Sequence, residues 1–449
     1  MAYEAVDVIE VRCWGATVGA VALDPRTGFY AFEYDDGWLR RRDDLAPTTM
    51  PLASGRGPHI FPTLEPNTYQ RLPALVADSL PDDFGNALTN AYLVSQGVGT
   101  GQINALDRLA YLGKRGIGAL EFRPARGPRT RKATAIDLSE LVLAARGALS
   151  GDMTSEQGIT QALSHLIAVG TSAGGARAKA VVALNPATGE LRSGQVPADA
   201  GFEQWLIKLD GVGGDADLGT SKDFGRIEYA YCRMASTAGI SMTGCRLLRE
   251  GGRAHFMTRR FDRDPDGTKI HVQTLCGLGH LDYRLVGAHD YAQLFEHIDL
   301  LGLGPEARAE AFRRMVFNVA AANCDDHTKN FSFLLREGGA WELSPAYDVT
   351  HAHAPDSKWT RQHLMAVNGQ TTNIALSDVR TVGERFGVPG VASIVGQVLE
   401  AVARWPALAA EAGVAQETAD KVAAHIETWS SPLRGAWRRA SSGHQGAPS

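Results

Sequence analysis

Polar and apolar residues alternate in short runs over residues 6 to about 125, for example in VDVIEVRCWG and GFYAFEYDDGWL. A period of two is typical of β-strands that bury one face. Near the end of this stretch, SLPDDFGNALTNAYLVSQG has a helical pattern, and Asp82 or Asp83 is placed to cap the helix. The pattern predicts a small, strand-rich unit with a helix near its end.

The rest of the chain changes from strands to helices. The segment RPARGPRTRKATA, residues 123 to 135, has no apolar period and marks a boundary or a surface crossing. Strands return as KAVVALN, QWLIKLD, AHFMTRRFD and KIHVQTL, interrupted by a helix at about 226 to 239. Helices follow from about 290, with a strand pair at 331 to 344. We therefore expect parts at 1–125, 126–275 and 276–435 and a disordered, apolar-poor tail at 436–449.

The composition is that of an ordinary globular protein, with 449 residues, 44% hydrophobic and 21% charged. A net charge of -5 gives no general reason for nucleic-acid or membrane binding. The 5 cysteines have no CxxC spacing, which indicates neither a zinc site nor a disulfide framework. The N-terminus is acidic where a signal peptide would be basic, and no run of about 18 apolar residues occurs. We expect a soluble, unexported protein in a reducing cytoplasm.

The first polar site is the glycine-rich stretch VGTSAGGARAKAVVALN, residues 169–185. Its small residues come directly before an apolar strand, so backbone N–H groups of the loop can approach an anion closely. The Walker pattern GxxxxGK[ST] is absent, and a plain turn between strands explains the same glycines.

The second site is a lysine inside the apolar strand EQWLIKLD, residues 203–210. The period of two places Leu206 and Lys208 on one face, and the other face holds Trp205, Ile207 and Leu209. Such a lysine either reaches water at an edge or meets an anion in a cleft. Glu228, on the following helix, is a candidate to orient it.

The third site is NCDDHTKNFSFLL, residues 323–335, where Asp325 and Asn330 stand five positions apart. The predicted hairpin returns Asp348, in SPAYDV, to the same end as Asn330. Oxygen ligands on two segments suit Mg²⁺, and the other carboxylate can orient an attacking hydroxyl. The alternative is a helix-capping loop in which Asp325 or Asp326 forms a turn and Asn330 satisfies backbone groups. His327 fits a hydrogen-bonded loop residue better than a metal ligand.

The order of these sites carries more information than each site alone. In a protein-kinase catalytic domain the functional parts follow the same order along the chain: a glycine loop, a strand lysine, D-x4-N and an aspartate after a hairpin. This order favours phosphoryl transfer from ATP.

The quoted motifs SAGGARAKA, WLIKLD, RRFDR, NCDDHTKNFSFLL and LSPAYDV together resemble the HipA family, the bacterial serine/threonine kinase toxins of type II toxin–antitoxin systems. Residues 6 to about 125, including SLPDDFG and LAYLGKRGIGALEF, are similar to the N-terminal region of that family. The resemblance implies an α+β, protein-kinase-like bilobal fold. It would have a small N-terminal β-rich subdomain, a β-rich part with the glycine loop, and a helical C-terminal lobe.

The resemblance also implies residue roles. Asp325 would be the catalytic base, Asn330 and Asp348 the Mg²⁺ ligands, and Ser172 an autophosphorylation site that switches the kinase off. Residues 259–261 would form the hinge that holds adenine through backbone groups. The full nucleotide-binding set would be Ser172, Ala173, Gly174, Gly175, Ala176, Arg177, Lys179, Lys208, Arg259, Arg260, Phe261, His327, Lys329, Asn330 and Asp348.

Two positions depart from the related patterns. Ala178 stands where the family loop often has proline, which removes no phosphate contact. Asn323 stands where eukaryotic kinases carry the histidine of HRD, and the family lacks that histidine too. The five-residue step to Asn330 selects Asp325 over Asp326 as the base.

By resemblance we expect ATP and Mg²⁺ as cofactors, and transfer of the γ-phosphate to a serine or threonine of a protein. An aminoacyl-tRNA synthetase is the family precedent for that substrate. A HipB-like helix-turn-helix antitoxin would be the partner and would bring DNA binding to the complex. Two alternatives stay open: a catalytically silent kinase-fold protein that acts by contacts alone as a co-repressor, and a small-molecule or lipid kinase.

Overall fold

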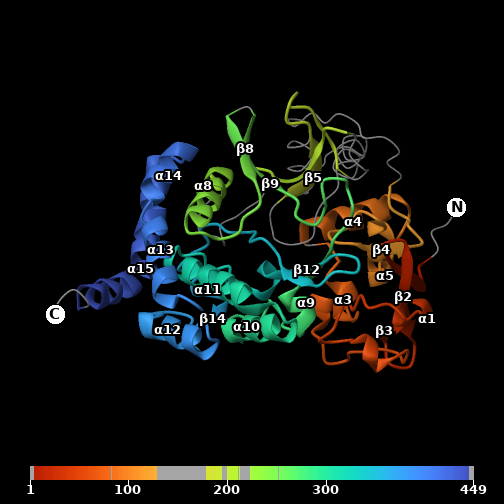
Figure 1. Ribbon diagram of the computed structural model, residues 1–449. Coiled ribbons are helices and arrows are strands. Elements are labelled where there is room, and N and C mark those ends of the chain that lie inside the picture. Colours follow the sequence, from red (N-terminus) through yellow and green to blue (C-terminus); the bar gives the residue numbers. More distant parts are fainter. Residues whose placement is uncertain are drawn as a thin grey trace. The chain divides into compact units, whose positions relative to one another are not determined.

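The computed structural model describes residues 5–443 except 82, 129–177, 195–199, 211, 213–222 and 251. The chain forms two compact units, whose elements are labelled in Figure 1. The first unit comprises residues 1–213, 248–280 and 333–340, and the second comprises 214–247, 281–332 and 341–449. The two units do not follow the three expected parts one for one, because the first unit takes in most of both β-rich parts.

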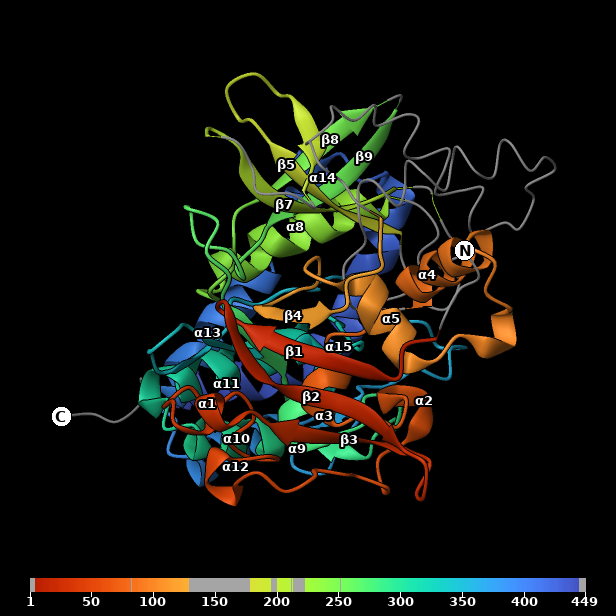
Figure 2. The same ribbon diagram turned by 90° about the vertical axis from the view of Figure 1, so that its right-hand side faces the viewer.

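The first unit begins with an antiparallel sheet of order β3-β2-β1-β4, which Figure 2 shows face on. Its strands are β1 (Val8–Cys13), β2 (Ala16–Asp24), β3 (Phe29–Tyr34) and β4 (Leu120–Arg123). Ile9, Val11 and Cys13 alternate with more exposed residues along β1, which confirms the period of two. Between β3 and β4 lie α1 (Asp36–Leu39), η1 (Leu52–Ser54), α2 (Pro66–Tyr69), α3 (Ala74–Ala77), α4 (Asp83–Ser95), η2 (Thr100–Gln102) and α5 (Ala105–Leu112). The expected helix is α4, and the capping position Asp82 lies outside the described residues.

A second sheet has the order β6-β5-β7-β9-β8. Its strands are β5 (Lys179–Leu184), β6 (Leu191–Ser193), β7 (Glu203–Lys208), β8 (Cys245–Glu250) and β9 (Arg253–Arg259). Trp205, Ile207 and Leu209 share one apolar cluster with Leu88 of α4, so the predicted apolar face of this strand is confirmed. The expected strand KIHVQTL is β10 (His271–Thr274), which leads into α9 (Leu275–Gly279).

The expected strand pair at 331 to 344 is the hairpin of β12 (Ser332–Leu335) and β13 (Trp341–Leu343), of which residues 333–340 belong to the first unit. The second unit is mainly helical, and its two short strands β11 (His289–Asp290) and β14 (Met365–Ala366) pair in parallel. The helices are α8 (Phe224–Thr237), α10 (Tyr291–Leu300), α11 (Gly304–Ala320), α12 (Leu376–Arg385), α13 (Val391–Val402), α14 (Trp405–Ala412) and α15 (Gln416–Gly443).

Buried aromatic side chains join three of these helices. The ring of Tyr231 on α8 lies 6.3 Å from that of Phe317 on α11 and 5.3 Å from that of Trp405 on α14. The Tyr231 hydroxyl donates to the carbonyl of Ala321, 2.6 Å away, at the end of α11. Because that carbonyl has no partner within the helix, the bond fixes the point where the chain leaves α11.

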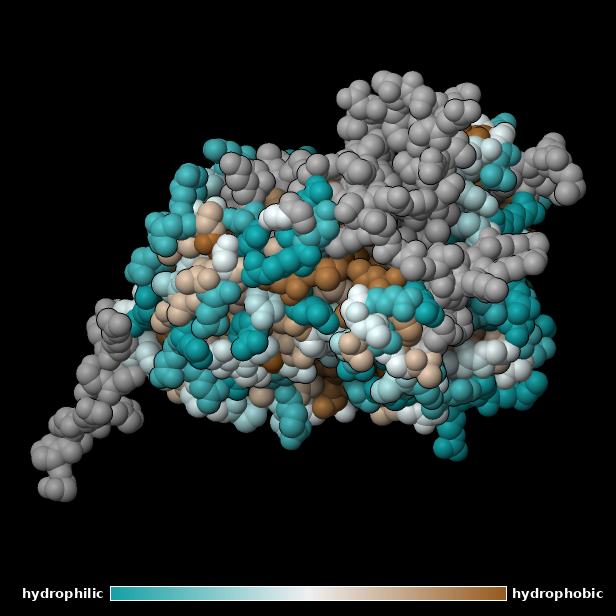
Figure 3. All heavy atoms as spheres, turned by 90° about the horizontal axis from the view of Figure 1, so that it is seen from above, coloured by the Kyte–Doolittle hydropathy of each residue, from teal (hydrophilic) through white to brown (hydrophobic). Residues whose placement is uncertain are grey.

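A disordered tail was expected from residue 436, and α15 continues to Gly443. Residues 444–449 lie outside the described residues. A Cβ added at Gly396 of α13 would come 2.9 Å from the indole ring of Trp437. A glycine on α13 thus makes room for a tryptophan on α15. Of the helices in the described part of the chain, none is both long and apolar enough to cross a membrane. Hydrophilic side chains predominate on the face shown in Figure 3.

Candidate active site

The chain leaves α11 through a fixed turn. Ala322 has φ +54°, a left-handed conformation that ends the helix. Asn323 then bonds back to Asn318, with its backbone N–H to the carbonyl at 3.0 Å and its Nδ2 to Oδ1 at 2.9 Å. The position of the loop that follows is therefore set by side chains of the helix that precedes it.

Asp326 lies in this loop, is only 1% exposed, and its carboxylate accepts several hydrogen bonds. One of its carboxylate oxygens accepts from the Tyr291 hydroxyl and from His363 Nδ1, both at 2.8 Å. The other accepts from the backbone N–H of Leu364 at 2.8 Å. Tyr291 in turn accepts from Asn318 Nδ2 at 2.9 Å. Asp326 therefore shapes the loop, as the sequence analysis expects.

Asp325 differs from its neighbour in being accessible. Its side chain is 33% exposed, and Oδ1 lies 3.8 Å from Nε2 of His327. Its backbone carbonyl accepts from Asn330 Nδ2 at 2.7 Å, which closes the predicted five-residue step into a compact loop. The His327 ring lies 5.1 Å from that of Tyr283, and Lys329 Nζ lies 4.9 Å from the same ring. The accessible carboxylate thus lies beside His327, and both His327 and Lys329 contact the ring of Tyr283.

Asp348 follows β13 on a segment that runs along this loop. Its neighbour Tyr347 donates its hydroxyl to the carbonyl of Lys329 at 2.6 Å. Farther on, Ala352 accepts from the backbone N–H of Cys324 at 3.0 Å and donates to Ala322 at 3.2 Å. Since both flanks of Asp348 are bonded to the loop of residues 322–330, the predicted return of this aspartate toward Asn330 is supported.

A buried arginine holds the start of the same segment. Arg314 of α11 donates to the carbonyl of Ser344 at 2.7 Å and pairs with Glu310 at 2.8 Å. Asp348 itself has φ +53°, a conformation that aspartate and asparagine tolerate better than most residues. Helix α11 thus positions both the loop after it and the aspartate after the hairpin.

The donor chemistry of Asn330 and Asp348 fits Mg²⁺, which takes one or two protein oxygens and completes its shell with water and phosphate oxygens. Within the described ranges, no group of three or more His, Cys, Asp or Glu side chains is arranged to hold a metal ion. A metal bound here would therefore depend on a bound nucleotide for the rest of its ligands.

The first unit carries the predicted phosphate lysine. Lys208 of β7 and Lys179 of β5 are direct partners across the antiparallel pair, and they are only 8% and 3% exposed. Lys208 lies on the face of its strand opposite the apolar cluster, with Nζ 5.9 Å from the ring centre of Phe256. Two lysines side by side on one sheet give a positive site suited to phosphate groups. The remaining expected members of this site, Ser172, Ala173, Gly174, Gly175, Ala176 and Arg177, lie outside the described residues.

The expected hinge, residues 259–261, lies at the end of β9. Arg259 is half exposed and pairs with Glu203 at 3.5 Å. The backbone N–H of Arg260 already donates to the carbonyl of Gln204 at 3.0 Å. Its side chain turns to Asp262, with Nη2 2.6 Å from Oδ2. Any adenine contact in this stretch would therefore use groups other than the N–H or the guanidinium of Arg260.

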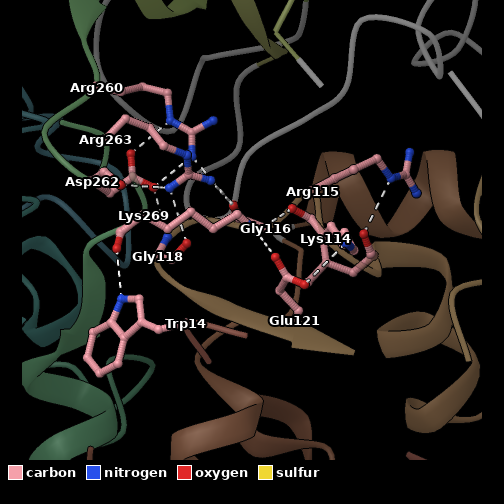
Figure 4. A network of polar contacts seen from close by, with 11 residues as sticks. Trp14, Lys114, Arg115, Gly116, Gly118, Glu121, Arg260, Asp262, Arg263 and Lys269 are labelled. Carbon is pink, nitrogen blue, oxygen red and sulfur yellow. Dashed lines mark hydrogen bonds and ion pairs between the residues drawn. The ribbon is translucent and has the colours of Figure 1, made fainter. Parts of the chain in front are cut away.

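Figure 4 shows that Arg260 and Arg263 converge on Asp262. Arg263 Nη1 lies 2.8 Å from Oδ2, and the backbone N–H of Gly118 donates to the same oxygen at 2.8 Å. Arg263 also donates to the carbonyl of Gly116 at 3.2 Å. Burial alone would raise the pKa of Asp262, but the two guanidinium groups hold it well below its usual range. This network joins the loop before β4 to the stretch after β9.

Replacing Asp262 by alanine is expected to destabilise the protein by about 3–5 kcal/mol, because two buried guanidinium groups lose their counter-charge. The measurement is urea unfolding followed by circular dichroism. Asp7→Ala serves as the control, since Asp7 is exposed and should cost less than about 0.5 kcal/mol. Equal unfolding midpoints for the two variants would show that the network contributes no stability.

A cluster of histidines in the second unit was missed at the sequence level. His351 Nε2 lies 2.9 Å from His425 Nδ1, and His353 Nδ1 lies 3.8 Å from the Cys324 sulfur. His363 is fully buried against Asp326. The contact joins residues 37 positions apart, so no local pattern reveals it. The only signal is the histidine itself, placed between polar and apolar residues in RQHLMAVNG.

Comparison with known proteins gives matches over both parts of the chain. The family model described as HipA-like C-terminal domain matches residues 171–428, and that described as HipA N-terminal domain matches residues 9–123. Putative kinase Y4mE of Sinorhizobium fredii is 25% identical over 365 residues, which cover 77% of this chain and 77% of that protein. Putative kinase Y4dM of the same organism is 25% identical over 180 residues, 34% of this chain and 39% of that protein.

Among solved structures, the chain is similar to one from a Shewanella oneidensis complex of the toxin–antitoxin system proteins HipA and HipB with operator DNA. The TM-score is 0.65 at 16% identity, and the match covers 94% of this chain and 96% of the other. At this identity the match shows the fold, and it confirms the expected α+β, kinase-like fold class.

Proposed function

The chain belongs to the HipA family, and from this membership we propose that it is an ATP- and Mg²⁺-dependent serine/threonine protein kinase, the toxin of a type II toxin–antitoxin system. One observation carries most of the proposal: of two adjacent aspartates, Asp326 is buried by three donors while Asp325 is left accessible beside Asn330. This is the arrangement that a catalytic base and an adjacent metal ligand require. The kinase names of two relatives agree with it.

In this reaction Asp325 accepts the proton of a serine or threonine hydroxyl as its oxygen bonds to the γ-phosphorus of ATP. The bond from that phosphorus to the β–γ bridging oxygen breaks, and ADP leaves with the electron pair. Lys208 and Lys179 would hold phosphate oxygens. Asn330 and Asp348 would hold Mg²⁺, which would supply positive charge to offset that of the phosphates. The remaining members of the nucleotide set, His327, Lys329 and residues 259–261, would contact ATP as the family resemblance implies.

We propose a HipB-like helix-turn-helix antitoxin as the partner, because the Shewanella oneidensis match comes from a complex with HipB and operator DNA. The protein substrate is an aminoacyl-tRNA synthetase by family precedent, so the outcome would be stalled translation in the cytoplasm. Self-labelling falls on Ser172 and switches the enzyme off.

The test is transfer of labelled phosphate from ATP with Mg²⁺ to proteins of a cell lysate and, in parallel, to a panel of small metabolites. We expect labelled phosphoserine or phosphothreonine in the lysate and self-labelling that Ser172→Ala abolishes without loss of ATP binding. Label in the metabolites alone would identify a small-molecule kinase. ATP binding without any transfer would identify a binding protein.

A further inference from the structure

A buried ion pair adjoins the proposed catalytic aspartate. His363 and Asp326 are both 0% exposed at their side chains, and Nδ1 lies 2.8 Å from the carboxylate oxygen. Such a pair costs desolvation energy and is retained where it fixes one arrangement of the chain. Other hydrogen bonds already hold this loop in place, so the presence of a costly buried ion pair calls for a separate explanation.

The charges of this pair follow from its surroundings. Burial lowers the pKa of His363, but the carboxylate of Asp326, with a smaller contribution from Cys324, raises it to about 10. The ring is therefore an imidazolium at neutral pH, and the pair is neutral as a whole. Trp429 packs edge-on against the ring, with centroids 4.7 Å apart, and Cys324 Sγ lies 4.0 Å from Nε2.

The His363–Asp326 ion pair holds the residue that follows Asp325, and a second set of hydrogen bonds holds the residues that precede it. Cys324 donates its backbone N–H to Ala352, and Asn323 is bonded to Asn318. The backbone of Asp325 is thus held from both directions, through Cys324 and through Asp326. An ionised Asp326 without its cation would place a second negative charge one residue from the base, where it would disfavour the approach of ATP.

We propose that His363 is a positioning residue for phosphoryl transfer: its imidazolium neutralises Asp326 and holds the loop so that the Asp325 carboxylate meets the substrate hydroxyl. The inference rests on the proposed kinase function and adds a residue to it. Because the His363 side chain is fully buried against Asp326, it would act through Asp326 and not on the substrate directly.

A neighbouring histidine offers a matched control. His425 is half-buried in the same cluster and bonds to His351, not to Asp326. Burial first, and then the neighbouring His425 and His353, lowers the pKa of His351 to about 3, so this part of the cluster is neutral. A His425→Asn variant disturbs the cluster and leaves the ion pair in place.

The activity test compares His363→Asn with His425→Asn. Asparagine keeps an N–H donor near Nδ1 and removes the charge, so kcat should fall about tenfold while KM for ATP stays within about twofold. The double variant Asp326→Asn/His363→Asn, in which both charges are absent, should recover at least about threefold over His363→Asn. His425→Asn should match the wild type within about twofold. A His363→Asn enzyme with wild-type kcat would overturn the proposal, and so would a double variant that shows no recovery.

Two measurements do not need kinase activity and separate this proposal from the proposed function. The ¹⁵N shifts of the His363 ring in the wild type at about pH 8 should show both nitrogens protonated, and a neutral ring would overturn the proposal. Hydrogen exchange over residues 323–330 should be faster in His363→Asn than in His425→Asn, and equal exchange would count against positioning. Failure of the wild type to transfer phosphate while both results hold would reject the kinase function alone.

Discussion

Replacing Asp325 by asparagine should lower phosphoryl transfer about a thousandfold, because an amide has no basic oxygen to take the hydroxyl proton. The bond from Asn330 goes to the backbone carbonyl of Asp325, so the substitution leaves it intact. The side chain is 33% exposed, and its replacement by an amide of the same size should not perturb the fold. The measurement is transfer of labelled phosphate from ATP under single-turnover conditions, with ATP affinity measured by isothermal titration.

The control for this experiment is Asp356→Asn, an exposed aspartate of the same unit that no part of the proposed site uses. It should retain wild-type transfer. Unchanged ATP affinity in Asp325→Asn would place its loss of rate in the chemical step. Equal labelling by wild type and Asp325→Asn would end the assignment of the base.

The adjacent residues Asp325 and Asp326 show how much of the candidate site can be predicted from the sequence. The five-residue step to Asn330 selects Asp325, but sequence spacing gives no information on burial. The structure adds that Asp326 is enclosed by a tyrosine, a histidine and a backbone N–H, which makes it a scaffold. Spacing and burial point to the same residue for independent reasons.

Features that depend on local pattern could be predicted. The period of two in β7 predicted the correct apolar face, and the turn signal between residues 331 and 344 predicted the hairpin of β12 and β13. Both follow from the fixed geometry of a strand, in which every second side chain faces the same side. Neither needs knowledge of distant parts of the chain.

Features that depend on distant contacts could not be predicted. Asp262 meets Gly118, 144 positions away, and His363 meets Asp326, 37 positions away. The motif RRFDR was assigned to a hinge, and its local sequence does not show that two arginine side chains enclose one aspartate. The approach of Trp437 to Gly396 on another helix is likewise invisible in the local sequence of the tail.

Replacing Asp348 by asparagine should remove most of the Mg²⁺ dependence of ATP binding. Asparagine tolerates the left-handed backbone at this position, with φ +53°, so the variant changes the charge with little strain. A neutral amide is a weaker Mg²⁺ ligand than a carboxylate, and the apparent affinity for Mg²⁺ should fall about tenfold or more, with a fall in kcat of about a hundredfold.

Titration of ATP into wild type and Asp348→Asn, with and without Mg²⁺, separates the metal effect from the nucleotide effect. Glu342→Gln is the matched control, because Glu342 is an exposed acid on β13 of the same hairpin. If the aspartate holds the metal, Mg²⁺ should strengthen ATP binding in the control and scarcely at all in Asp348→Asn. The same gain from Mg²⁺ in all three proteins would place the metal elsewhere, and Asp348 would then serve only to close the turn after the hairpin.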